Sequence, residues 1–256
     1  MRKSSTIKSL CLAVAFVFSG FAANAQLTHL EQSVFLNFNA PSPNFGGDLS
    51  NEPFSGVPLT RFRAGSCAGF GFGLGYRITY RFDVGFGDIS PYIHADANLN
   101  WVKSDIRDDF MTKANDGTAP KYINIPIFVG VNYRYQLDEI FTPFAEFGLG
   151  PDFFFITKEK GTVNTPINQL DGTTETIGDF NLKYQSSSKF AFQLGLGCYF
   201  GEHVSVSFHY SGYGKRAIKY TAKTEIPEAL AEIEAADTGV QSKNVGLFSF
   251  RIGFHF

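Results

Sequence analysis

Apolar and polar residues alternate with a period of two through most of the chain, and the C-terminal segment shows this alternation most clearly. Its apolar positions are Phe248, Phe250, Ile252, Phe254 and Phe256. The residues between them are Ser249, Arg251, Gly253 and His255. Because successive side chains of a β-strand point to opposite faces, this pattern predicts a strand with one fully apolar face.

Eight segments carry such alternation, so the chain is predicted to be all-β. We expect strands near Glu31–Asn39, Ala64–Phe82, Pro91–Ser104, Lys121–Tyr135, Thr142–Thr157, Ser188–Phe200, His203–Lys215 and Asn244–Phe256. The connections 40–63, 105–120, 158–187 and 216–243 are long, whereas 83–90, 136–141 and 201–202 are short. Short turns at one end and long loops at the other are typical of an outer-membrane barrel. The predicted fold is an eight-stranded antiparallel up-and-down transmembrane β-barrel.

The lysines distinguish this prediction from a soluble lipocalin-like barrel, which also alternates but turns its apolar face inward and its charged face to water. All eleven lysines after residue 25 fall in the long connections or at the strand ends that adjoin them. A cation at mid-bilayer costs about 2 to 4 kcal/mol, so lipid-facing strands explain why the strand middles hold no lysine. The charged fraction of 18% is also low for a surface that meets only water.

Aromatic residues gather at both ends of the predicted strands, which predicts girdles at the two membrane interfaces. Near the short turns they are Tyr80, Phe82, Tyr92, Tyr133, Tyr135, Tyr199 and Phe256. Toward the long loops they are Trp101, Tyr122, Phe154, Phe190, Tyr210 and Tyr213.

The first 25 residues have the parts of a secretory signal peptide. Three cations precede an apolar stretch over residues 10–23, and the small-x-small sequence Ala-Asn-Ala ends at Ala25. We therefore expect a cleaved signal peptide at 1–25 and a barrel domain at 26–256, exported through the periplasm to the cell outer membrane. The mature chain would hold 19 basic and 24 acidic residues, which excludes a basic field for binding nucleic acid.

Four strings carry a resemblance to a known family. They are YINIPIFVGVNYRY at 122–135, TPFAEFGLGP at 142–151, FAFQLGLGCYFGEHVSVSFHYSGYG at 190–214, and FSFRIGFHF ending at Phe256. These strings resemble the outer-membrane β-barrel family common in Bacteroidetes, described as porin-family or PorT-like, with small OmpA and OmpX barrels as more distant analogues. The resemblance implies that Phe250, Ile252, Phe254 and Phe256 form a C-terminal signal for the barrel-assembly machinery. It implies a location and a fold, but no catalytic residue.

Charged residues on the inward faces predict one ionic layer inside the barrel. If the second hairpin is symmetric about the turn 83–90, Arg77 lies opposite Asp96. Glu146, Arg251 and His209 are expected at similar heights. Buried charges must be paired, because an unpaired one costs several kcal/mol, so this layer is either a structural plug or a gate whose pairs exchange. An eight-stranded barrel is largely filled by side chains, which disfavours a wide channel.

The histidine positions argue against an enzyme, because lipid-modifying or proteolytic chemistry would need a histidine base near the outer rim. His29 precedes the first strand, and His203 lies at a short turn. His94, His209 and His255 are expected to point inward in the lower or middle barrel. The spacing of His, Cys, Asp and Glu also predicts no metal site, and no cofactor is expected.

The outer rim carries five lysines at the height of lipopolysaccharide phosphates, so contact with lipopolysaccharide is one interpretation and simple loop solubility is the other. These are Lys103, Lys121, Lys189, Lys215 and Lys243. In the last loop, Pro227 followed by EALAEIEAA predicts a short helix. This helix would cover the barrel mouth or meet a partner.

The sequence therefore favours a monomeric integral outer-membrane barrel with a structural or surface-interaction role. A narrow gated channel for small solutes or ions is the alternative. The expected partners are outer-membrane lipid, lipopolysaccharide and the assembly machinery.

The two cysteines of the mature chain are predicted to stay unpaired. Cys67 is expected on the inward face near the long loops and Cys198 on the outward face near the short turns, so a disulfide cannot span them. Mass spectrometry after alkylation of the denatured, unreduced protein should find both thiols labelled. An intramolecular disulfide would show that the strand assignment is wrong.

Overall fold

The computed structural model describes residues 30–46, 68–104, 107, 114–137, 140–166, 174–217, 220–224 and 242–256. The predicted signal peptide, the segment after Pro227 and Cys67 lie outside these residues, and Cys198 forms no disulfide with another described residue. No helix within the described ranges is long and apolar enough to cross a membrane.

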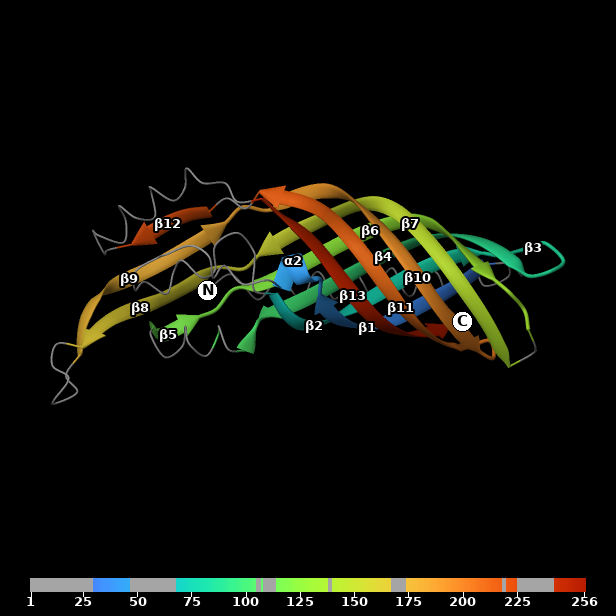
Figure 1. Cartoon of the computed structure of the whole chain (residues 1–256), viewed down its shortest axis with the longest axis horizontal. Coiled ribbons are helices and arrows are strands. Elements are labelled where there is room, and N and C mark those ends of the chain that lie inside the picture. Colours follow the sequence, from blue (N-terminus) through green and yellow to red (C-terminus); the bar gives the residue numbers. More distant parts are fainter. Residues whose placement is uncertain are drawn as a thin grey trace, which may run out of the picture.

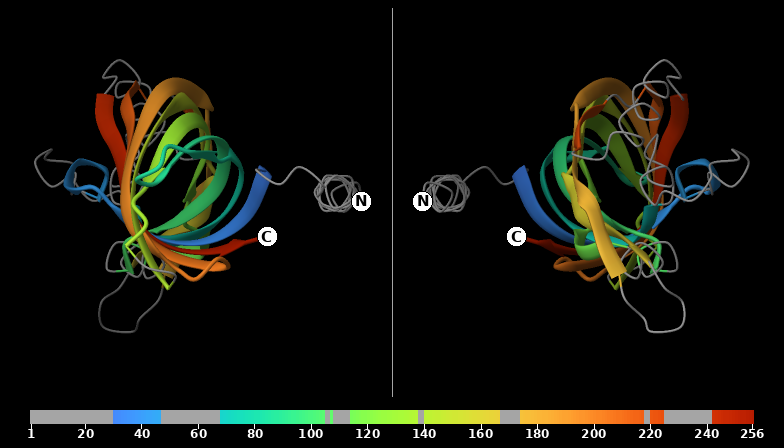
Figure 2. Two further views of the ribbon diagram at one scale, coloured as in Figure 1. Left: turned by 90° about the vertical axis from the view of Figure 1, so that its right-hand side faces the viewer. Right: turned by 90° about the vertical axis from the view of Figure 1, so that its left-hand side faces the viewer.

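Eight long strands form a closed barrel, which confirms the predicted fold (Figures 1 and 2). They are β1 (Leu30–Pro41), β2 (Ala68–Tyr80), β4 (Asp88–Val102), β6 (Lys121–Arg134), β7 (Phe141–Ile156), β10 (Ser187–Phe200), β11 (Val204–Ala217) and β13 (Ser242–His255). Each pairs antiparallel with its neighbours, and β1 closes the barrel by pairing with both β2 and β13. We call the end with the long loops the outer end and the end with the short turns the inner end.

The barrel is polar inside and apolar outside, the reverse of a soluble domain. Along β4 the side chains of His94, Asp96 and Asn98 are at most 2% exposed, whereas Ile93 between Tyr92 and His94 is 58% exposed. The other barrel strands repeat this alternation. A lipid environment explains this arrangement, because a continuous outward belt of Phe, Leu, Ile and Val is stable in contact with hydrocarbon and not with water.

Glycines on β2 make room for the inward polar side chains of β4. A Cβ atom at Gly73 would lie 2.2 Å from Oδ1 of Asn98, and one at Gly75 would lie 2.4 Å from Oδ1 of Asp96. The alternation of glycines along β2, at residues 69, 71, 73 and 75, therefore serves close packing. It lets polar side chains of the neighbouring strand lie flat against the inner wall.

The long connections contain a second sheet that the sequence did not predict. Its strands are β5 (Ala114–Thr118), β8 (Glu159–Pro166), β9 (Thr174–Tyr184) and β12 (Tyr220–Thr224), in the order β12-β9-β8-β5. It extends from the outer end of the barrel, where β8 and β9 prolong the β7–β10 hairpin (Figure 1). The segment EKGTVNTP is mostly polar, and TETIGDFNLKY alternates only in its second half, at Phe180, Leu182 and Tyr184. Neither segment carries the longer alternation of a barrel strand.

The prediction of two aromatic girdles is correct only in part. Trp101, Phe190 and Phe256 are exposed on the outside at the strand ends. Five of the predicted girdle residues are instead at most 4% exposed, and they point into the lumen: Tyr92, Tyr122, Phe154, Tyr199 and Tyr213. Their position at the strand ends predicted that they lie at the membrane interface. Whether a side chain points inward or outward is set instead by its place in the alternation, and Tyr92 shares the inward face with His94.

The sheet of β5, β8, β9 and β12, which we call the outer sheet, contains a buried carboxyl group outside the membrane-spanning strands. The Tyr184 hydroxyl donates a 2.7 Å hydrogen bond to Oε2 of Glu159, whose side chain is fully buried. Burial raises the pKa of Glu159 to about 8, and the Tyr184 hydrogen bond only partly opposes this shift. The folded sheet therefore favours the neutral carboxyl group.

The pairing of β8 with β9 should weaken as the pH rises from 5 to 8. In this range Glu159 ionises when the sheet opens but stays protonated when it is closed, so opening becomes easier by up to about tenfold per pH unit. Above about pH 8 the effect should level off. Hydrogen exchange of the β8 amides, corrected for intrinsic rates, measures this opening.

Glu159→Gln should remove this pH dependence. The matched control is Asp179→Asn, which changes an exposed carboxyl group on β9 and should keep it. Equal pH slopes in the wild type and Glu159→Gln would contradict the assignment.

Candidate functional site

The short turn between β2 and β4 sets the register of the inward charges, and it corrects the predicted pairing. Arg77 lies opposite His94, and Asp96 lies opposite Gly75. The hairpin extends through β3 (Phe82–Asp83), so the turn itself covers residues 84–87 and not 83–90. A 3.0 Å bond from the Val84 amide to the Gly87 carbonyl closes it, and Gly85 has a φ of 84°. Because the hairpin is centred on this shorter turn, the partner of Arg77 is His94, two residues before the predicted partner Asp96.

Arg77 reaches across the lumen from β2 to Glu146 on β7. Its two terminal nitrogens each donate a 2.7 Å hydrogen bond to a different Glu146 oxygen. Asn132 donates a further bond of 3.2 Å to Oε2 of Glu146, and Nδ1 of His209 lies 3.3 Å from Oε1. Such a two-point contact between a guanidinium and a carboxylate is among the strongest charged hydrogen bonds in proteins.

Arg251 and Asp96 form the second pair at this level. Nη2 of Arg251 donates a 2.6 Å bond to Oδ2 of Asp96, and the Asn37 amide donates a 2.8 Å bond to Oδ1. Nε2 of His94 lies 2.8 Å from Oδ1 of Asp96, while Nδ1 accepts a 3.3 Å bond from Nε of Arg77. The structure thus brings the five predicted residues of the ionic layer together, and His94 links the two pairs. His94 was not among the residues predicted for this layer, although it shares a face with Asp96.

A second group of charges lies near the inner end and was not predicted. Arg134 makes two 2.7 Å hydrogen bonds to Glu31, and the guanidinium lies 4.1 Å from the ring centre of Tyr199. Nδ1 of His255 is 3.1 Å from Oε1 of Glu31. We call this group the inner tier and the Arg77–Glu146 and Arg251–Asp96 pairs with their histidines the middle tier.

A further ion pair and an aromatic cluster close the outer end, and we call this pair the outer tier. Arg216 donates to Asp152 and to the Ser187 carbonyl, and its guanidinium lies 5.2 Å from the ring centre of Phe154. Above this pair the short helix α2 (Pro43–Gly46) inserts the fully buried Phe45. Its ring centre lies 5.5 Å from that of Tyr122 and 6.1 Å from that of Phe154.

Several buried amide atoms between the middle and outer tiers have no hydrogen-bond partner among the described residues. They include both amide atoms of Asn124, Nδ2 of Asn98 and Oδ1 of Asn100. Each of these three side chains is at most 1% exposed. Because a buried amide that is left unpaired is costly, this part of the lumen is suited to small polar guests such as water.

Two serine–histidine–carboxylate arrangements occur in the lumen. His209 lies 2.8 Å from Ser207 Oγ and 3.3 Å from Glu146, and His255 lies 2.7 Å from Ser205 Oγ and 3.1 Å from Glu31. The geometry suits activation of a hydroxyl group, but both serines are only 1% exposed. Here the contacts hold the histidines in the charged tiers.

Within the described ranges, no three His, Cys, Asp or Glu side chains are placed to hold a metal ion.

The rim lysines differ in the direction that they face. Lys121 and Lys215 are exposed and Lys103 is half-buried, and all three lie on the outward face of their strands. Lys189 is exposed but lies opposite the inward Asp152, so its position faces the barrel mouth. Lys243 belongs to β13, but its side chain lies outside the described residues.

The C-terminal strand presents its apolar face outward. Phe254 and Phe256 are exposed, whereas Phe250 and Ile252 are half-buried. Two 3.0 Å backbone bonds join Phe256 to Gln32 and extend the seam between β13 and β1.

Comparison with known proteins gives one family match and several distant structures. The family model described as "Outer membrane protein beta-barrel domain" matches residues 10–247. OprG from Pseudomonas aeruginosa is 16% identical with a TM-score of 0.40, over 89% of this chain and 96% of that chain. Ail of Yersinia pestis is 11% identical with a TM-score of 0.38, over 89% and 98%. The outer membrane enzyme PagL is 13% identical with a TM-score of 0.39, over 88% and 98%. No curated protein matches the chain, and similarities this low carry no argument about function.

Removing one partner of a middle-tier pair should cost far more than removing both. Arg77→Ala leaves Glu146 buried without its main partner, so the free energy of unfolding should fall by about 3–5 kcal/mol. Arg77→Ala/Glu146→Ala should recover much of this loss. Urea titration of the refolded barrel, monitored by its heat-dependent mobility in gels, gives both values.

The matched control is the exposed pair Arg81–Asp88, whose charged atoms are 2.7 Å apart. Arg81→Ala should cost about 0–1 kcal/mol. If Arg77→Ala and Arg81→Ala were equally destabilising, the middle tier would not hold the barrel together.

Proposed function

Because the chain belongs to the family of outer membrane protein β-barrel domains, we propose that it is a non-catalytic barrel with a sealed lumen that supports the outer membrane and makes surface contacts through its outer end. The observation that carries this proposal is the stack of three charged tiers in the lumen. Paired charges at three heights leave the interior filled and fixed, as a structural plug requires. Two catalytic-like hydroxyl groups, on Ser205 and Ser207, are enclosed in that plug, which supports a role without catalysis.

The outer end supports the surface part of the proposal. The sheet of β5, β8, β9 and β12 extends the barrel beyond the rim, and its edge strands β5 and β12 offer backbone groups to a partner. We propose that the outward rim lysines Lys103, Lys121 and Lys215 contact lipopolysaccharide phosphates. Lys189 and Lys243 are the other two of the five lysines predicted to contact lipopolysaccharide.

The proposal includes how the barrel is exported and assembled. We propose export by a cleaved signal peptide at residues 1–25 and recognition of the Phe250, Ile252, Phe254 and Phe256 face by the barrel-assembly machinery. The four strings quoted above support a place in the Bacteroidetes, PorT-like branch of the family, and the mature barrel is proposed to be a monomer.

A narrow channel is the second candidate, and a specific observation favours it. The unpaired amide atoms of Asn98, Asn100 and Asn124 are buried polar groups in the lumen to which a solute can hydrogen-bond. Small polar solutes could pass along these groups if the Arg77–Glu146 and Arg251–Asp96 pairs exchanged partners. The middle tier would then be a gate instead of a plug.

Single-channel recording in planar bilayers separates the two candidates. The refolded wild type should give no discrete current steps, because three tiers block the lumen. Arg77→Ala/Glu146→Ala opens the middle tier alone and should also stay silent, since the inner and outer tiers remain. Arg81→Ala/Asp88→Ala, outside the lumen, is the matched control.

Discrete steps in the wild type that change in the Arg77→Ala/Glu146→Ala variant would overturn the sealed barrel and support the channel. The folded state of each sample is checked by gel mobility before recording.

A further inference from the structure

Two parallel rows of outward side chains cross six neighbouring strands of the barrel wall. The row nearer the outer end consists of Ala40, Phe248, Tyr210, Leu194, Phe147 and Val131, each directly opposite the next. The row below it consists of Phe38, Phe250, Phe208, Leu196, Ala145 and Tyr133, paired in the same way. The two rows therefore run perpendicular to the strands around the lipid-facing wall.

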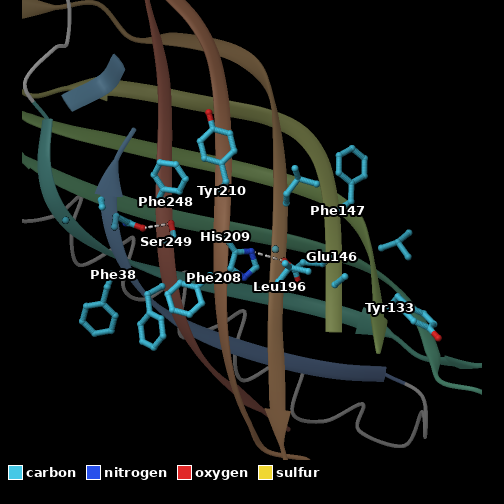
Figure 3. Close-up of a pocket in the computed structure, with 18 of the residues that line it drawn as sticks. Phe38, Tyr133, Glu146, Phe147, Leu196, Phe208, His209, Tyr210, Phe248 and Ser249 are labelled. Carbon is cyan, nitrogen blue, oxygen red and sulfur yellow. Dashed lines mark hydrogen bonds and ion pairs between the residues drawn. The ribbon is translucent and has the colours of Figure 1, made fainter. Parts of the chain in front are cut away.

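A continuous apolar groove of about 1070 Å³ lies along these rows. Its floor is the backbone of the inward residues between the rows, including Gly195, His209 and Ser249. In Figure 3 the groove-lining side chains extend across the wall from Phe38 and Phe248 to Tyr133. The small side chain of Ala145 leaves the groove open in the lower row.

The groove slopes from the outer end toward the inner end. Ala40 is one residue from the outer end of β1, whereas Tyr133 is one residue from the inner end of β6. Five steps between strands about 4.8 Å apart give a path of roughly 24 Å. With strands tilted about 40° from the membrane normal, such a path descends roughly 15 Å, about half of a 30 Å hydrocarbon core. This is the depth that an acyl chain of one leaflet occupies.

The exposed cation Lys215 lies on β11, on the outer-end side of the groove residue Tyr210. The strand β11 is irregular between Gly212 and Lys215, and Gly214 has a φ of 77°. Beyond this irregularity Lys215 lies outward and exposed, opposite the exposed Asn244. It is five residues nearer the outer end than Tyr210 on the same strand. Its ammonium group is therefore at the height of lipid headgroups.

We propose that the groove binds one acyl chain of a phosphorylated outer-leaflet glycolipid, with a phosphate of its headgroup at Lys215. The apolar rows contact the chain over its length, and Lys215 supplies the opposite charge for the phosphate. The inference deepens the lipopolysaccharide contact proposed above and rests on it for the headgroup alone. A lipid bound in this groove would stabilise the folded barrel. Its binding does not depend on whether the lumen conducts.

The test uses the full mature barrel, delipidated in detergent and titrated with lipid A, with bound lipid counted by native mass spectrometry. The wild type should retain one lipid A more tightly than the others. Ala145→Phe fills the groove and should weaken this first binding step at least tenfold. The matched control is Ala97→Phe, an outward exposed alanine on β4 that does not line the groove, and it should bind as the wild type does.

Lys215→Gln should weaken lipid A binding several-fold, but it should leave the binding of dephosphorylated lipid A unchanged. This pair of results separates the headgroup contact from the groove itself. If Ala145→Phe does not fold, Ala40→Phe blocks the outer end of the same groove.

Equal effects of Ala145→Phe and Ala97→Phe would overturn the groove, and so would equally tight binding of phosphatidylethanolamine. A loss in Ala145→Phe with no effect of Lys215→Gln would overturn the headgroup contact. A conducting wild type would affect only the sealed-lumen proposal, because the groove lies on the outer wall.

Discussion

The contact between Arg77 and Glu146 crosses the lumen from β2 to β7, strands that are far apart around the wall. A guanidinium and a carboxylate that are both withdrawn from water are tolerable only as a well-bonded pair. Much of the inner wall follows from this need. Glycines on β2 clear space for Asp96 and Asn98, Asn132 supports Glu146, and His94 fills the gap between the two ion pairs.

The same constraint shapes the outside of the barrel. With the charged groups paired inside, the wall can present an apolar surface to lipid, and the lysines are kept at the rim. Alternation along each barrel strand serves both purposes, because almost every inward polar residue is followed by an outward apolar one. The inclined groove also results from this arrangement, since its floor consists of the backbone of residues that point into the lumen.

The three tiers and the outer sheet divide the molecule into parts with different surroundings. Phe45 and the Arg216–Asp152 pair close the lumen at the outer end, and Glu31 and Arg134 close it at the inner end. The sheet of β5, β8, β9 and β12 lies beyond the outer closure, where Glu159 is the buried acid. The ionisation of Glu159 in that sheet can therefore follow the external pH while the ion pairs in the lumen stay unchanged.

Alternation, lysine positions and loop lengths in the sequence alone determined the eight barrel strands, their lipid-facing side and five of the six members of the middle tier, His94 being the exception. They did so because a strand's two faces are encoded residue by residue, and lipid and lumen demand opposite chemistry. The sequence did not determine which arginine meets which acid, because a turn of four residues, 84–87, sets the register and barrel closure brings β7 opposite β2. Glu31 with Arg134, Asp152 with Arg216, and the outer sheet also depend on that closure. Their partners lie on distant strands or on segments whose alternation is short or absent, so only the tertiary structure identifies them.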